Sequence, residues 1–183
     1  MLKALDVANF FVDLANNTVE ECMTNVRINK FLYFAQAWSL VRLNKPLFEE
    51  EIQAWQLGPV VPSVYRAFQP CGYDRIKDVA TDYSLEAFSH EQIELLLDVA
   101  RYYGQYSSTK LIDMTHEKGG PWDEVYEMGV PFIVISKDNM KNYFSKEELP
   151  SFKFTYNPET DVIGHRDAEG YLVLPKEYDD EAE

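Results

Sequence analysis

The chain has 183 residues, of which 46% are hydrophobic and 14% aromatic, so it can bury the core of one ordinary domain and is not a disordered protein. Seventeen basic residues against 31 acidic ones give a formal net charge of −14, which disfavours direct binding to the phosphates of nucleic acid. The acidic charge either keeps the surface soluble or attracts a basic protein partner.

The cysteines and the N-terminus indicate the compartment. Cys22 and Cys71 lie far apart without the CxxC spacing of a thiol metal site, which is typical of a reducing cytosol. Asp6 and Asp13 interrupt the apolar N-terminal residues, unlike the apolar core of a signal peptide, and no long apolar run follows. We therefore expect a cytoplasmic protein without a membrane span.

Two helices are predicted in the first quarter of the chain. Apolar residues at helical spacing predict the first over residues 3–16. Thr24 is a suitable N-cap for a second helix, which the Asn44–Pro46 turn ends. This second helix is apolar on nearly every side, so we expect it at the centre of the core.

A stiff elbow follows in AWQLGPVVPSVYRAF, residues 54–68. Residues 47–55 are predicted to be a loop or a short extended piece. Gly58 permits an unusual φ, Pro59 fixes the next φ, and Pro62 suits the first turn of a helix. This elbow is either a preorganised frame for binding or only a corner of the core.

The middle of the chain carries clear helix signals. Residues 71–88 are polar and turn-rich, which predicts a loop. Ser89 and Gln92 form a capping box before a helix that Gly104 ends. Three shorter features follow, namely a helix capped by Ser107 or Ser108, a turn opened by Pro121 after Gly119–Gly120, and a helix that begins at Ser136.

The C-terminal part changes from helical to alternating periodicity. Residues 151–176 predict a short β appendage in the form of a meander, and the five acids within 177–183 predict a disordered tail. The predicted fold class is therefore mainly α, with a single compact helical domain of about six to seven helices over residues 1–150.

No pattern in the sequence indicates an enzyme. The three histidines have no metal-ligand spacing, and the sequence contains no phosphate loop, no nucleophile elbow and no HExxH motif. His116 lies at a predicted helix end, where a histidine either bonds the last carbonyls or, in the alternative, acts in catalysis. We expect no catalytic residue, no cofactor and no metal. Most aromatic residues belong to the predicted core, and any binding face is expected at the rim of the elbow.

A family resemblance rests on these segments. The run NKFLYFAQAWSLVRLNKPLFEEEIQAWQLGPVVPSVYRAF resembles the signature of the Panacea domain, also called the SocA-like antitoxin domain, which occurs in phage-associated proteins. KLIDMTHEKGGPWDEV and ISKDNMKNYF resemble its later blocks, so the likeness spans roughly residues 4–144. The residues that match the signature, and that are the candidates for partner binding, are Lys30, Tyr33, Trp38, Trp55, Gly58, Pro59, Pro62, Tyr65, His116, Pro121 and Trp122.

The resemblance implies an antitoxin that neutralises a toxin encoded beside it by direct protein contact. It also implies a ClpXP-type protease as a further candidate partner. Most signature residues are expected to build the shared fold, whereas residues 151–183 or the loop 70–88 are hypothesised to choose the partner. Two alternatives remain, a proteolytic adaptor or phage-encoded regulator that binds a host protein, and an acidic mimic of nucleic acid.

Overall fold

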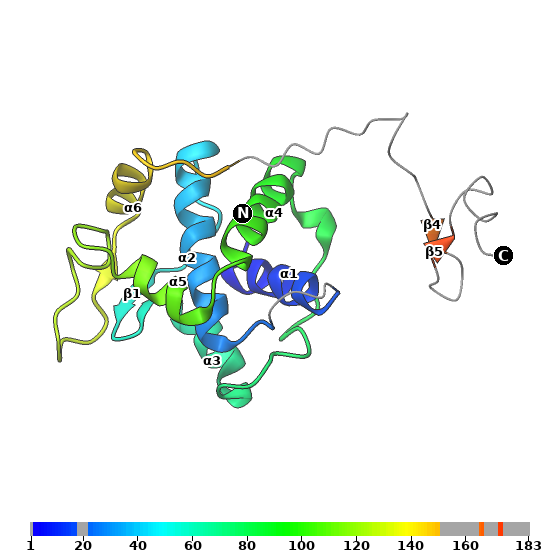
Figure 1. Cartoon of the computed structure of the whole chain (residues 1–183), viewed down its shortest axis with the longest axis horizontal. Coiled ribbons are helices and arrows are strands. Elements are labelled where there is room, and N and C mark those ends of the chain that lie inside the picture. The colour runs from blue at the N-terminus through cyan, green and yellow to red at the C-terminus, as the bar shows by residue number, and fades with distance from the viewer. Residues whose placement is uncertain (1, 18–21, 151–164, 167–171, 174–183) are drawn as a thin grey trace. The chain divides into compact units, whose positions relative to one another are not determined.

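The computed structural model describes residues 2–17, 22–150, 165–166 and 172–173. The chain divides into two units, Met1–Ser151 and Phe152–Glu183. The first unit is mainly α, which confirms the predicted fold class (Figure 1). Its helices are α1 (Ala4–Asn16), α2 (Asn25–Arg42), α3 (Pro62–Phe68), α4 (His90–Gly104), α5 (Ser108–Thr115) and α6 (Lys137–Phe144), with two short 3-10 helices at Gln69–Cys71 and Leu85–Ala87.

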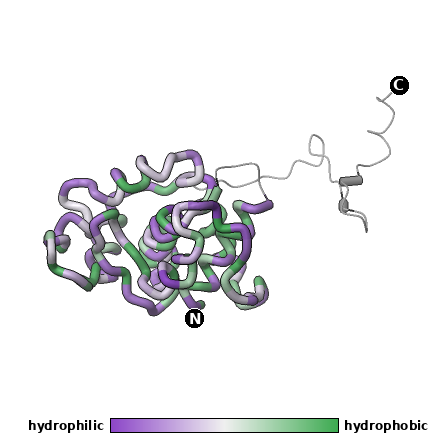
Figure 2. The backbone as a smooth tube through the Cα atoms, turned by 90° about the horizontal axis from the view of Figure 1, so that it is seen from below, coloured by the Kyte–Doolittle hydropathy of each residue, from purple (hydrophilic) through white to green (hydrophobic). Residues whose placement is uncertain are grey.

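Helix α2 is the centre of this unit, as its composition predicted. Fifteen of its 18 residues are buried, and it packs against α1, α3, α4, α5 and α6. Figure 1 shows it between α1 and α4 on one side and α6 with β1 on the other. Hydropathy changes over short distances along the backbone (Figure 2), because elements that surround a central helix present one face to it and the other to water.

The helix N-termini form where the caps were predicted. Thr24 Oγ1 accepts a hydrogen bond from the amide of Arg27 in α2, and Ser89 and Gln92 make the reciprocal capping box of α4. Ser107, rather than Ser108, caps α5, and Ser136 caps α6. Gly104 is the last residue of α4, where the sequence predicted the end of this helix.

A small sheet lies in the same unit. The segment predicted as a loop or extended piece contains β1 (Ile52–Trp55), which turns back into β2 (Gly58–Val60). A third strand, β3 (Val134–Ile135), pairs with the other edge of β1, so the strand order is β2-β1-β3 and all pairs are antiparallel. The sequence did not predict β3 or this sheet.

The loop before α4 is fixed to the first helix. Asn9 Nδ2 donates to the carbonyl of Thr81, and Asn9 Oδ1 accepts from the amide of Ala80. Ile76 is fully buried, and its amide donates to the carbonyl of Met23. The predicted loop 71–88 is therefore held in place by buried contacts, although Tyr73 is 89% exposed.

The second unit contains one described strand pair. Strands β4 (His165–Arg166) and β5 (Leu172–Val173) pair antiparallel. The rest of the predicted meander and the acidic tail 177–183 lie outside the described residues. No helix within the described residues is long and apolar enough to cross a membrane.

Candidate functional site

The elbow is a hairpin that approaches α2 and α5 closely. Gly58 has φ +98°, and a Cβ atom there would lie 2.6 Å from Thr115 Oγ1 and 2.9 Å from Lys30 Cε. A side chain would be strained by the backbone angle and would also collide with these two neighbours. The sequence needs glycine at this position because three segments meet there.

Lys30 holds the hairpin from the side of α2. Its Nζ donates to the carbonyl of Pro59 at 3.0 Å, and the residue is 1% exposed. Burial lowers its pKa from 10.5 to about 7, because the charged amine loses its hydration. Lys30 therefore acts as a buried donor to the backbone and lies too deep to meet a large substrate.

Asparagines of α2 fix the path of the chain into α3. Asn29 Oδ1 accepts from the amide of Val61 at 2.9 Å, and Asn29 Nδ2 donates to the carbonyl of Asn25. Asn25 Nδ2 in turn donates to the carbonyl of Tyr65 at 3.0 Å. The elbow is thus fixed by side-chain hydrogen bonds as well as by its prolines. The sequence did not predict a role for either asparagine, because α2 carries several other polar residues and nothing distinguishes these two.

His116 and Trp122 close the elbow from the far side. Their ring centroids lie 3.8 Å apart, and Trp122 Nε1 donates to the carbonyl of Trp55 at 2.9 Å. Burial, and after it the charge of Lys30, lowers the pKa of His116, against opposing effects led by Asp113. His116 Nε2 is buried without a hydrogen-bond partner among the described residues, so a neutral imidazole that packs on Trp122 fits this position better than a charged one.

The structure brings most signature residues together but leaves few of them accessible. Seven are buried, and these are Lys30, Tyr33, Trp38, Gly58, Pro59, Pro121 and Trp122. The four partly exposed ones are Trp55, Pro62, Tyr65 and His116. Tyr33 and Trp38 lie further along α2, where they pack against Phe144. Because buried side chains cannot touch a partner, only the partly exposed ones stay candidates for direct contact.

The rim of the elbow offers a small hollow. The rings of Trp55 and Tyr65 meet edge to face with centroids 4.9 Å apart. Together with Leu57 they line a hollow of about 150 Å³ that reaches down to Asn29 and Lys30. This is the place at which the sequence predicted a binding face, and its size allows one side chain rather than a segment of a partner.

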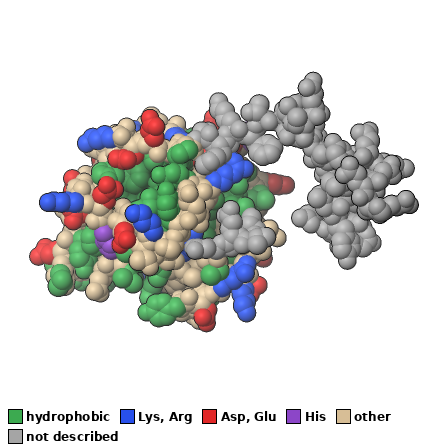
Figure 3. Space-filling view, in the orientation of Figure 1, with side chains coloured by type: hydrophobic (Ala, Val, Ile, Leu, Met, Phe, Trp, Pro, Cys, Tyr) green, Lys and Arg blue, Asp and Glu red, His purple; other side chains and the backbone are tan. Residues whose placement is uncertain are grey.

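A larger apolar surface lies beside the elbow, where the sequence did not predict one. Met128, Val130 and Phe132 are 87%, 42% and 70% exposed, and we call these three residues the apolar surface. Residues 126–132 and 54–56 line a hollow of about 530 Å³ there. Figure 3 shows hydrophobic side chains at the surface between acidic ones on this side of the molecule. Exposed apolar clusters of this kind are typical of protein-binding sites.

Acidic residues border the neighbouring part of the sheet. Glu49, Glu50, Glu51 and Asp138 line a third hollow, of about 260 Å³, together with Lys137, and we call this hollow the acidic groove. Lys137 Nζ donates to the carboxylate and to the carbonyl of Glu49, at 2.9 and 3.1 Å. Four carboxylates against one ammonium leave the groove negative.

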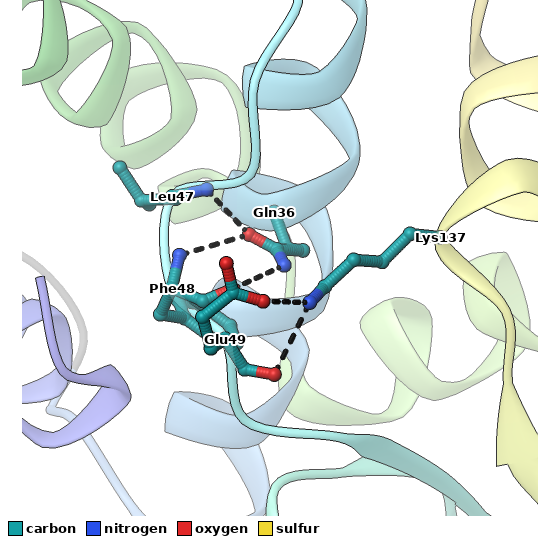
Figure 4. A network of polar contacts seen from close by, with 5 residues as sticks. All are labelled: Gln36, Leu47, Phe48, Glu49 and Lys137. Carbon is teal, nitrogen blue, oxygen red and sulfur yellow. Dashed lines mark hydrogen bonds and ion pairs between the residues drawn. The ribbon is translucent and has the colours of Figure 1, made fainter. Parts of the chain in front are cut away.

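Gln36 of α2 supports the acidic groove from the core side, next to Leu47, Phe48 and Glu49 (Figure 4). Its Oε1 accepts from the amides of Leu47 and Phe48 at 2.8 and 3.3 Å, and its Nε2 donates to the carbonyl of Phe48 at 2.8 Å. All three residues are fully buried. One side chain of α2 therefore satisfies three backbone groups that would otherwise be buried without partners.

The sequence contained one signal for the apolar surface. The run GVPFIVI, residues 129–135, is apolar, begins with glycine and contains Pro131, which fits a buried strand as well as an exposed loop. Only the structure separates its inward residue, Ile135, from the outward ones. Among the described residues, no group of three or more His, Cys, Asp or Glu side chains could hold a metal ion.

Comparisons with known proteins place the chain in a family. Antitoxin SocA of Caulobacter vibrioides (strain NA1000 / CB15N) is 33% identical over 131 residues, which cover 65% of this chain and 68% of the relative. No solved structure matches. The family described as Antitoxin SocA-like, Panacea domain, matches residues 28–123, a range that contains every signature residue predicted above. The chain therefore belongs to the SocA-like antitoxin family with a Panacea domain.

Proposed function

We propose that the chain is an antitoxin that neutralises a cognate toxin by binding it directly in the cytoplasm. Family membership supports the antitoxin role. The observation that favours direct binding is the apolar surface, since Met128 and Phe132 are 87% and 70% exposed beside a hollow of about 530 Å³. Exposing large apolar side chains to water is unfavourable unless a partner covers them.

The buried elbow supports a binding role over catalysis. Among the signature residues at the elbow, Lys30 and His116 have lowered pKa values. Lys30 is 1% exposed and donates to a backbone carbonyl, and the ring of His116 packs on Trp122. A general base must reach the proton that it removes. We therefore assign this cluster to the frame that holds the binding surface.

The test uses the protein encoded beside this chain in its own genome. The chain and that neighbour are expressed together and apart in cells, and growth is followed. We expect the neighbour to stop growth when alone, growth to return when the chain is present, and the two proteins to purify as one complex. Restored growth without any complex would contradict direct binding.

A second measurement separates inhibition from delivery to a protease. If the chain only inhibits, the half-life of the toxin stays unchanged in cells with and without ClpXP. A half-life that falls only when both the chain and ClpXP are present would instead identify a proteolytic adaptor.

A further inference from the structure

The apolar surface and the acidic groove adjoin along one strand pair. Ala54 and Trp55 of β1 line the apolar hollow, whereas Ile52 of β1 and Val134 of β3 line the acidic groove. Neighbouring residues of a strand are about 3.3 Å apart. The two hollows are therefore close enough for one short segment of a partner to cover both.

The backbone between them can pair with such a segment. The amide of Ala54 donates to the carbonyl of Ile133 at 2.8 Å, and the register places Gln53 opposite Val134. In an antiparallel ladder, hydrogen-bonded residue pairs alternate with pairs whose N–H and C=O groups point away from each other. Because Ala54 and Ile133 form a hydrogen-bonded pair, Gln53 and Val134 form a pair of the second kind. Val134, at the sheet edge and 40% exposed, thus presents a donor and an acceptor outward between the two hollows.

The conformation of Phe132 is a second sign of a binding role. Its φ is +63°, in the left-handed region that a bulky side chain disfavours. This strained position carries an aromatic ring that is 70% exposed and lines the apolar hollow. Strained residues of this kind tend to lie where a ligand or partner is bound.

The charges define the chemistry of the partner. The acidic groove carries Glu49, Glu50, Glu51 and Asp138 against Lys137, within a chain of net charge −14. A basic segment is attracted to it, and an acidic segment or a phosphate backbone is repelled. The apolar surface, beside the acidic groove, does not select for charge and would bind apolar side chains of the same segment.

We infer that the apolar surface, the edge of β3 and the acidic groove together bind one extended segment of the toxin, with apolar residues at one end and basic residues at the other. The inference rests on the proposed function and gives it a site. Backbone pairing with Val134 sets the extended conformation, apolar side chains cover Phe132 and Met128, and lysine or arginine side chains lie over Glu51.

The experiment measures the dissociation constant of the purified full chain for the neighbour-encoded toxin. Phe132→Ser should weaken binding about 10- to 100-fold, as expected when a large apolar contact is lost. Tyr73→Ser is the comparison variant, because Tyr73 is also an exposed ring (89%) but lies in the loop 70–88, the alternative segment predicted to choose the partner. A dissociation constant close to that of the wild type supports the proposed site, whereas a loss as large as that of Phe132→Ser would assign binding to the loop and overturn the inference.

Two further variants test the edge and the charge. Val134→Pro removes the outward N–H without removing a ladder bond to β1 and should weaken binding about tenfold. Glu51→Lys should also weaken binding and reduce its salt dependence. Its control, Glu91→Lys, makes the same charge change at an exposed position of α4 and should have a much smaller effect.

The outcomes separate the two proposals. If the wild-type chain does not bind the neighbour, the proposed function fails, and the site fails with it. If the wild type binds and Phe132→Ser, Val134→Pro and Glu51→Lys bind equally well, only the site is wrong. Concentration-dependent dimerisation of the chain alone that Phe132→Ser abolishes would assign the surface to a second copy and overturn the inference.

Discussion

The elbow and the apolar surface are adjacent, yet the elbow is buried and held by hydrogen bonds, whereas the apolar surface is exposed to water. At the elbow, Lys30 and Gly58 are buried and fixed by hydrogen bonds and close contacts. At the apolar surface, Met128 and Phe132 face water, and Phe132 holds a strained backbone angle. The family match covers the elbow and ends at residue 123, before residues 128–134. The buried frame thus lies within the family match, and the exposed edge lies beyond its end.

The largest expected effect tests the close approach at the elbow. Gly58→Ala should lower the free energy of unfolding by about 4 kcal/mol, because it adds the cost of a left-handed backbone to that of overpacking against Thr115 and Lys30. Urea denaturation measures the loss. Gly119→Ala is the control, since Gly119 also has positive φ (+75°) but no atom within 4 Å of the added Cβ. Equal losses in both variants would show that contact with Lys30 and Thr115 is unimportant.

The next effect concerns the support below the acidic groove. Gln36→Leu should lower the free energy of unfolding by about 3 kcal/mol, because it leaves buried backbone groups of Leu47 and Phe48 without partners. The exposed Gln105→Leu serves as control and should change stability by less than about 0.5 kcal/mol. A Gln36→Leu variant as stable as the wild type would mean that water replaces the amide.

The pH dependence of stability tests the buried amine. Lys30 has a folded pKa of about 7 against 10.5 when unfolded, so between these values the unfolded chain binds more protons than the folded one. Stability therefore rises with pH in this window, by roughly 2 kcal/mol from pH 7 to pH 9. Lys30→Met should lose this increment. Parallel pH profiles of the wild type and Lys30→Met in urea denaturation would refute the depressed pKa.

The smallest effect has the opposite sign and tests the strained ring. Phe132→Asn should raise the free energy of unfolding by about 0.5 kcal/mol, because asparagine tolerates the left-handed conformation, while binding of the toxin weakens. Val130→Asn, at a position without positive φ, should bring no gain. A loss of stability in Phe132→Asn would indicate that the ring packs onto the fold instead of being held ready for a partner.

Local signals predicted most of the helices. Thr24, Ser89 and Ser136 cap helices as expected, since a cap acts through hydrogen bonds within three residues. The short strands were harder, because β1 and β3 have four and two residues and show no clear alternation. The predicted binding rim holds only a small hollow, and the partner contacts of the signature residues stay predictions.

The sequence by itself determined the helical frame, the central place of α2 and the family, because caps, 3.6-residue periodicity and the run around Gly58 act over short distances. Tertiary structure alone decided which apolar residues stay outside. Ile135 is buried and Phe132 exposed, although both belong to one apolar run, because burial depends on what packs opposite. That neighbour is β1, a segment far earlier in the chain, and no local pattern encodes the pairing.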